Sequence, residues 1–257
     1  MFIAHFGVAL AAKKAAPKTS LGTLILAAQF LDFLWPAFLL LGIEHVRIVP
    51  GATTVSPLEF TDYPISHSLL MATVWAVLFG GVYYGLRRNA RSALVVGTAV
   101  ISHWVLDFIV HRPDLQLYPG SEVRVGLGLW NSLPGSIALE VFFFGAGLWV
   151  YLGCTRARDN IGRYGLWAFI ALLFFGWVST LFAGAPPSVT ALGILGLLTW
   201  LFPFWLLLIL RSRLNFFRLS GKNTRDKAHK LGRSHQFEVR GESSQDIGST
   251  RGRRHLH

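Results

Sequence analysis

Long apolar runs dominate the chain, and short polar segments separate them. A helix needs about 20 residues to cross a bilayer. Six runs approach or exceed this length, at residues 21–43, 64–86, 92–110, 133–152, 164–182 and 189–210. They are continuous blocks, without the alternating or 3.6-residue period of a half-exposed fold. A shorter apolar stretch, residues 1–12, has too few residues to cross. The pattern predicts an all-α integral membrane protein with about six transmembrane helices and an N-terminal half-helix.

Composition supports a membrane protein. Hydrophobic residues make up 53% of the chain and charged residues 14%, whereas a soluble domain carries about 25% charge. The chain has one cysteine, Cys154, which excludes a disulfide framework and a multi-thiolate metal site. Any metal would therefore have to be held by nitrogen and oxygen ligands.

The basic residues indicate the orientation of the spans, because short loops rich in Lys and Arg remain in the cytoplasm. Cations gather on alternate sides of successive runs, at Lys13, Lys14 and Lys18, at Arg87, Arg88 and Arg91, at Arg156, Arg158 and Arg163, and from Arg211 onward. The pattern predicts a multi-pass protein of the inner (plasma) membrane with its C-terminus in the cytoplasm.

The charge distribution also predicts two domains. Residues 1–210 form the helical membrane domain, and residues 211–257 form a basic tail that contributes to the formal net charge of +11. The tail has few apolar residues, so we expect it to be disordered. Its cations suit contact with anionic membrane lipids, and no motif indicates specific binding of nucleic acid.

Ionisable residues within the apolar runs need an explanation, since each costs at least about 2.5 kcal/mol at mid-membrane. They are His5, Asp32, His67, His103, Asp107, His111 and Glu140. Imidazoles and carboxylates are ligands that Zn, Mn and non-haem Fe prefer. The cluster predicts a divalent metal site with Zn as first choice and Mn or Fe as alternatives.

His103, Asp107 and His111 recur at every fourth residue and share one helix face. Neighbours at this spacing can bind one ion, but the outer pair are about 12 Å apart and cannot. Either one ion has further ligands from other helices, or there are two ions. Helical rise also places Asp32 at about the same depth as His103.

Several of these elements resemble a known family. They are His5, Gln29-x-x-Asp32, the segment Tyr63-Pro64-Ile65-Ser66-His67-Ser68, and Ser102-His103-x-x-x-Asp107-x-x-x-His111. In order and spacing they are similar to the YdjM-like, or LexA-binding, family of bacterial inner-membrane metal-dependent hydrolases. The resemblance covers about residues 1–140, without the last two spans and the tail. The distant similarity of that family to zinc-dependent phospholipases C implies phosphoester chemistry.

A hydrolase would use these residues as follows. His67, His103 and Asp107 are the first ligands, and Asp32 and His5 complete this site or a second one. A bound ion would activate water and polarise an ester or phosphoester, with a lipid among the candidate substrates, at the outer half of the membrane.

Supporting roles fall to the neighbouring residues. Ser66 and Ser68 are placed to orient His67. Glu140 is the candidate general base, and Arg112 is a candidate for holding a phosphate.

Three other functions are compatible with the pattern. The same residues could form a proton relay in a transporter, His67 and His111 could ligate a haem, or the protein could be a scaffold with a vestigial site. Metal content separates the hydrolase from the relay, because a relay leaves its imidazoles free of metal.

Overall fold

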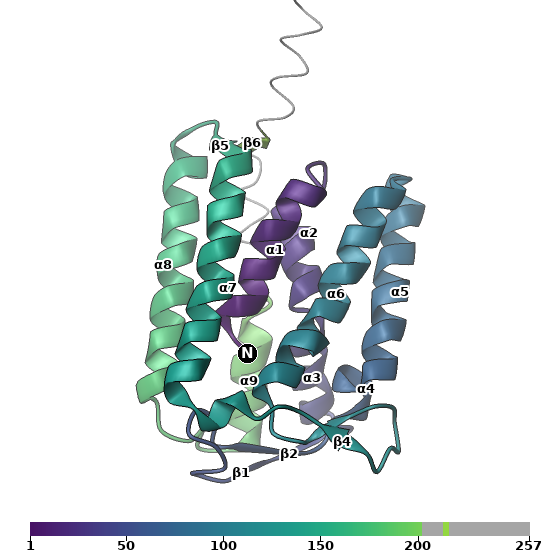
Figure 1. Cartoon of the computed structure of the whole chain (residues 1–257), viewed down its shortest axis with the longest axis vertical. Helices are drawn as coiled ribbons and strands as arrows, with labels where there is room; N and C mark the ends of the chain where they lie inside the picture. Colours follow the sequence, from purple (N-terminus) through teal and green to yellow (C-terminus); the bar gives the residue numbers. More distant parts are fainter. Residues whose placement is uncertain (202–212, 216–257) are drawn as a thin grey trace, which may run out of the picture. The chain divides into compact units, whose positions relative to one another are not determined.

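Helices form most of the chain in the computed structural model, which describes residues 1–201 and 213–215 (Figure 1). The helices are α1 (Ile3–Ala15), α2 (Leu21–Ala28), α3 (Phe30–Leu40), α4 (Pro64–His67), α5 (Leu69–Arg87), α6 (Ala90–Val110), α7 (Leu133–Cys154), α8 (Asn160–Phe182), α9 (Val189–Leu198) and a 3₁₀ turn, η1 (Leu129–Asn131). The short strands are β1 (His45–Ile48), β2 (Leu58–Asp62), β3 (Leu115–Gln116), β4 (Arg124–Val125), β5 (Thr155–Ala157) and β6 (Arg213–Asn215).

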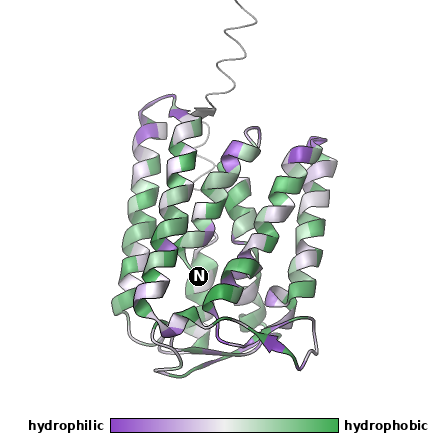
Figure 2. Cartoon of the chain, viewed as in Figure 1, coloured by the Kyte–Doolittle hydropathy of each residue, from purple (hydrophilic) through white to green (hydrophobic). Residues whose placement is uncertain are grey.

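Four helices, α5 to α8, are long and apolar enough to cross a membrane, and α2 with α3 makes a fifth if the bent pair counts as one span. Their outer faces carry exposed apolar side chains such as Val77, Leu94, Trp149 and Phe175. Hydrophilic positions gather at several helix ends and on the connecting loops (Figure 2). The membrane-spanning prediction is confirmed, but the described residues show four or five spans instead of six. The sixth predicted run is described only through α9 and residues 199–201.

Two of the predicted spans are interrupted. The run over residues 21–43 breaks at Gln29, where α2 and α3 meet at an angle of 56°. The run that begins at Pro64 breaks at Ser68, whose extended backbone ends α4 and whose side chain accepts a hydrogen bond from the backbone N–H of Met71 to cap α5. Broken helices expose backbone groups and are tolerated in membranes where they are buried in protein or line a cavity.

The N-terminal helix α1 lies within the bundle, packed against α7, α2 and α6 (Figure 1). Its contact with α7 depends on two glycines, because a Cβ on Gly147 would lie 2.0 Å from the carbonyl oxygen of Gly7, and a Cβ on Gly7 would lie 2.2 Å from that of Phe143. Only glycine permits this approach. It brings the start of α1, with His5, to the centre of the structure.

Strands β1 and β2 form an antiparallel hairpin at one end of the bundle, close to the smaller β3–β4 pair (Figure 1). The prediction of a purely helical protein missed these strands. The signal was present, since His45-Val46-Arg47-Ile48 and Leu58-Glu59-Phe60 alternate polar and apolar residues as strands do. The predicted disordered tail, residues 211–257, lies outside the described residues except for β6.

Candidate metal centre

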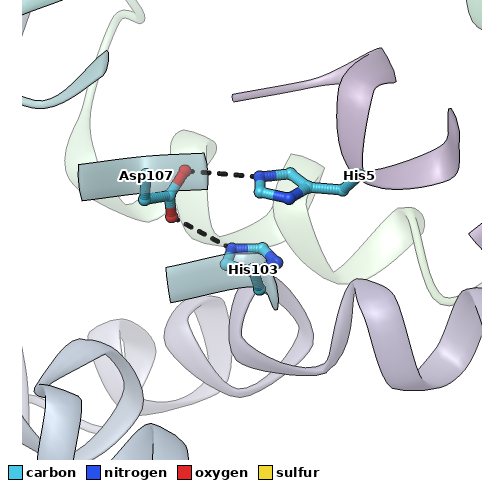
Figure 3. A group of neighbouring side chains, drawn as sticks. All are labelled: His5, His103 and Asp107. Carbon is cyan, nitrogen blue, oxygen red and sulfur yellow. Dashed lines mark ion pairs between the residues drawn. The ribbon is translucent and has the colours of Figure 1, made fainter. Parts of the chain in front are cut away.

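Five of the ionisable side chains meet at one point inside the bundle. They come from four helices, α1, α3, α4 and α6, and are His5, Asp32, His67, His103 and Asp107. All are buried except Asp32, whose side chain is 38% exposed. Figure 3 shows His5 and His103 next to each other, each paired with a different oxygen of the Asp107 carboxylate. The helix break at Gln29 comes three residues before Asp32 of α3, and the break at Ser68 directly follows His67 of α4.

Two overlapping sets of three side chains have ligand atoms within 4.8 Å of one another, one made of His5, His103 and Asp107 and the other of Asp32, His67 and His103. Among Asp32, His67, His103 and Asp107, each imidazole Nε2 also lies close to both carboxylates. His103 Nε2 lies 3.1 Å from Asp107 Oδ2 and 3.6 Å from Asp32 Oδ1. His67 Nε2 lies 3.7 Å and 3.6 Å from the same two oxygens. Donors about 2.0–2.1 Å from a tetrahedral zinc ion stand about 3.3–3.4 Å apart. The observed distances agree with this geometry within a few tenths of an ångström.

The proton on His103 is fixed by the break between α2 and α3. His103 Nδ1 lies 2.8 Å from the carbonyl oxygen of Ala28, which belongs to the last turn of α2. A carbonyl can only accept, so Nδ1 carries the proton and Nε2 of the neutral ring has a lone pair. Within the described part of the chain this buried Nε2 has no hydrogen-bond partner. In the neutral ring, His103 Nε2 therefore faces the carboxylate oxygens with a lone pair.

The orientation of His67 depends on Glu44, a fully buried residue before β1. The Glu44 carboxylate accepts hydrogen bonds from the backbone N–H groups of Ile65 and Ser66, at 2.8 and 2.7 Å, and from the Ser66 hydroxyl at 2.6 Å. Ser66 Oγ has then given its only proton, so it accepts from His67 Nδ1 at 2.7 Å. The predicted contact between Ser66 and His67 is present, and it leaves Nε2 of His67 as a second lone pair.

With both rings neutral, the four ligand atoms are all hydrogen-bond acceptors, and none of them can donate a hydrogen bond to another. Two imidazole lone pairs and two carboxylates converge inside the protein, where unpaired polar groups are costly. A divalent cation would satisfy all four at once. The donor chemistry and the fixed tautomers therefore fit a metal ion such as zinc.

The other oxygen of Asp107 has its own partners. His5 Nε2 lies 3.3 Å from Asp107 Oδ1, and the amino group of Met1 donates to the same oxygen at 2.8 Å. The His5 ring also stacks on that of His103, with 3.7 Å between centroids and 1° between planes. These contacts hold Asp107 so that its Oδ2 faces the Nε2 atoms of His67 and His103.

Glu140, predicted as the general base, lies beside α1. Its two oxygens accept hydrogen bonds from the backbone N–H groups of Phe2 and Ala4, each at 2.7 Å. These N–H groups belong to the first turn of α1, where no backbone partner exists. The geometry gives Glu140 a part in anchoring α1, and its role as a base stays a prediction.

His111 lies outside the five-residue cluster. Its Nδ1 is 2.9 Å from Asp114 Oδ1 and 3.3 Å from the hydroxyl of Tyr63, which itself donates to Asp114 at 2.7 Å. Burial, and then the charge of Asp114, raise the pKa of Tyr63 well above its usual range. Tyr63 therefore stays protonated and holds the Asp114 carboxylate against His111.

Arg112, predicted to hold a phosphate, is engaged elsewhere. It lies 3.1 Å from Glu59 and 3.6 Å from Asp114, and it does not line the cavity next to the cluster. Glu59 also pairs with Arg47 of β1, and these hydrogen bonds, the one from Arg47 first, lower the pKa of Glu59. Arg112 thus ties the end of α6 to the β1–β2 hairpin.

A cavity of about 350 Å³ adjoins the cluster. Asp32, His67 and Asp107 open into it, and most of the remaining wall is apolar and aromatic, from α1, α3, β2, α8 and α9. The cluster is therefore accessible to a small molecule or to part of a larger one.

Comparison of the chain with curated proteins and with solved structures finds no match. Among protein families, the one described as YdjM inner membrane protein matches residues 2–185. The match extends beyond the expected residues 1–140 and includes α8, so the expectation that both of the last two spans stand outside the resemblance is wrong for α8. This chain belongs to the YdjM inner membrane protein family.

Proposed function

We propose that this protein is a membrane-embedded, metal-dependent hydrolase that cleaves an ester or phosphoester. Asp32, His67, His103 and Asp107 would bind one divalent ion. The observation that carries the proposal is the pair of imidazole Nε2 atoms, each 3.1–3.7 Å from two carboxylate oxygens, in a buried site. A hydrolytic ion also needs a position for water, so water would bind on the cavity side, beside or in place of the partly exposed Asp32.

The donor set favours zinc over the alternatives. Two imidazole nitrogens and two carboxylate oxygens at tetrahedral spacing suit zinc, whereas manganese is usually bound by more oxygen ligands in an octahedral shell. Iron(II) sites also keep open positions beyond a two-histidine, one-carboxylate face. Manganese and iron remain the next candidates for the same residues.

When bound, the ion would lower the pKa of a water molecule and polarise the scissile group. The protein residues position the ligands. Glu44 and Ser66 fix His67, the carbonyl of Ala28 fixes His103, and His5 braces Asp107. Asp32, the partly exposed ligand, is the carboxylate best placed to accept a proton from the cavity side.

A proton relay is the second candidate, and a specific feature favours it. An extra proton on His103 Nε2 would also satisfy the nearby Asp107 Oδ2, at 3.1 Å, without any metal. Metal dependence separates the two functions, because a relay does not need an ion and a hydrolase of this kind does.

The test is hydrolysis of a chromogenic ester, 4-nitrophenyl butyrate, by the full-length protein purified in detergent. We expect activity that is lost on chelation and restored by zinc. His103→Ala should abolish it, and His45→Ala, at an exposed histidine of β1, should leave it unchanged. Activity that survives both chelation and His103→Ala would contradict the proposal.

A further inference from the structure

The wall of the cavity is divided by chemistry. Its ionisable side chains belong to the metal cluster or adjoin it, as His111 and Glu140 do. The rest of the wall is largely apolar, with Phe33 from α3, Trp177 from α8 and Leu192 from α9. A ligand that fills this space must combine one polar group for the cluster with an apolar portion for the remaining wall.

Among the described residues, the cavity offers no positive side chain to an anionic ligand, and the amino group of Met1, whose residue lines the cavity, is already bonded to Asp107. No Lys or Arg of residues 1–201 lines it, and the nearby Arg112 is paired with Glu59 and Asp114. The carboxylates of Asp32, Asp107 and Glu140 would balance a divalent ion together with the Met1 amino group. A phosphate would therefore bring an uncompensated negative charge into a largely apolar space, which is costly.

The helices that form the apolar part of the wall also expose apolar side chains, as helices in contact with lipid do. Helices α8 and α9 line the cavity with Leu181 and Leu192, and they carry exposed apolar side chains, such as Phe182 and Leu195, on other faces. A molecule dissolved in the membrane would thus have its chain at the same depth as the cavity.

We infer that the substrate is an uncharged carboxylic ester with a long apolar chain, and that the chain lies against α3, α8 and α9 while the ester group reaches the cluster. The inference rests on the proposed function and narrows it from esters and phosphoesters to one class. In the reaction, the oxygen of water bonds to the acyl carbon, the bond from that carbon to the alcohol oxygen breaks, and the alcohol oxygen takes a proton.

Chain length tests where the apolar portion lies. The zinc-loaded full-length protein is assayed with 4-nitrophenyl esters from acetate to decanoate. We expect wild type to prefer the longer chains. Leu192→Trp, which fills the cavity, should shift the preference to shorter chains by at least about fourfold per methylene excluded, the value of roughly 0.8 kcal/mol for each buried methylene.

Leu195→Trp is the matched control, because Leu195 is on the same helix but 58% exposed and away from the cavity. It should leave the chain-length profile unchanged. If Leu192→Trp does not fold, Leu181→Trp on α8 makes the same test. Equal profiles for wild type, the cavity variant and the control would overturn the placement of the chain.

The charge argument is tested with a matched pair of substrates, 4-nitrophenyl octanoate and the phosphodiester 4-nitrophenyl octyl phosphate. We expect turnover of the ester and at least a hundredfold slower turnover of the phosphodiester. In a binding assay, octanohydroxamate should raise the melting temperature of the zinc-loaded protein more than octylphosphonate does.

Different results would overturn the ester substrate and the proposed hydrolase function. A metal-bound protein that prefers the phosphodiester or binds octylphosphonate more tightly overturns this inference and leaves the proposed hydrolase standing. A protein that holds no metal and hydrolyses neither compound overturns both.

Discussion

The close contact between α1 and α7 makes a sharp prediction about Gly147→Ala. A Cβ at this position would lie 2.0 Å from the carbonyl oxygen of Gly7, and real Cβ contacts essentially never fall below 3.0 Å. Helix α1 must therefore move away from α7 by about 1 Å. Overpacking of this kind costs about 1–3 kcal/mol of folding stability.

The displacement would reach the candidate metal centre, because α1 carries His5. His5 Nε2 lies 3.3 Å from Asp107 Oδ1, and its ring stacks on His103 at 3.7 Å. A shift of about 1 Å exceeds the roughly 0.5 Å within which a functional site must be held. We expect the affinity for zinc to fall about 10- to 100-fold, as when other groups that orient metal ligands are lost.

The assay combines thermal unfolding of the detergent-purified protein with zinc affinity measured against a competing chelator. Gly145→Ala is the control, since a Cβ there meets nothing within 4 Å and the helix gains propensity. Equal melting temperatures and equal zinc affinities for the two variants would show that the close packing of α1 against α7 does not position the site.

Two further predictions concern residues that support the site. Glu44→Gln should weaken zinc binding about 10- to 100-fold by loosening Ser66 and His67, with Glu122→Gln at an exposed loop residue as the control; an unchanged affinity would remove Glu44 from the site. The lowered pKa of Glu59 means that its contribution to stability is complete above its ordinary value of 4.5 and is lost as the pH falls through the lowered value. The protection of the β1–β2 hairpin against hydrogen exchange, corrected for the intrinsic rate at each pH, should therefore fall below about pH 4.5, and in Glu59→Gln it should be low already at neutral pH. Protection that neither change affects would show that the ion pairs do not anchor the hairpin.

The sequence predicted that the chain spans a membrane, because a bilayer imposes a length and a composition that are visible in any window of the chain. It predicted about six spans, whereas the described residues show four or five. It also predicted which polar residues would meet. His103 and Asp107 share a helix face, and the depth of Asp32, counted from Ser20, matches that of His103. The structure brings these residues together with His5 and His67. The geometry of these residues supports the proposed metal binding, and the metal content of the protein tests it.

Other features could not be predicted, for physical reasons. The bend at Gln29 follows from tertiary packing and has no glycine or proline at the break, so the role of the Ala28 carbonyl was not visible. Glu44 lies in a polar loop, where a carboxylate has no reason to attract notice until the fold buries it against Ser66. The pairing of Arg112 with Glu59 was not predictable either, because the two residues are distant in sequence.

The metal content of the purified full-length protein tests the central claim most directly. Elemental analysis should find about one divalent ion, zinc by preference, per chain. His103→Ala and Asp107→Ala should lose it, and His111→Ala should lose much less because His111 lies outside the cluster. A wild-type protein without a divalent ion, or full occupancy in His103→Ala and Asp107→Ala, would contradict the account and favour the proton relay.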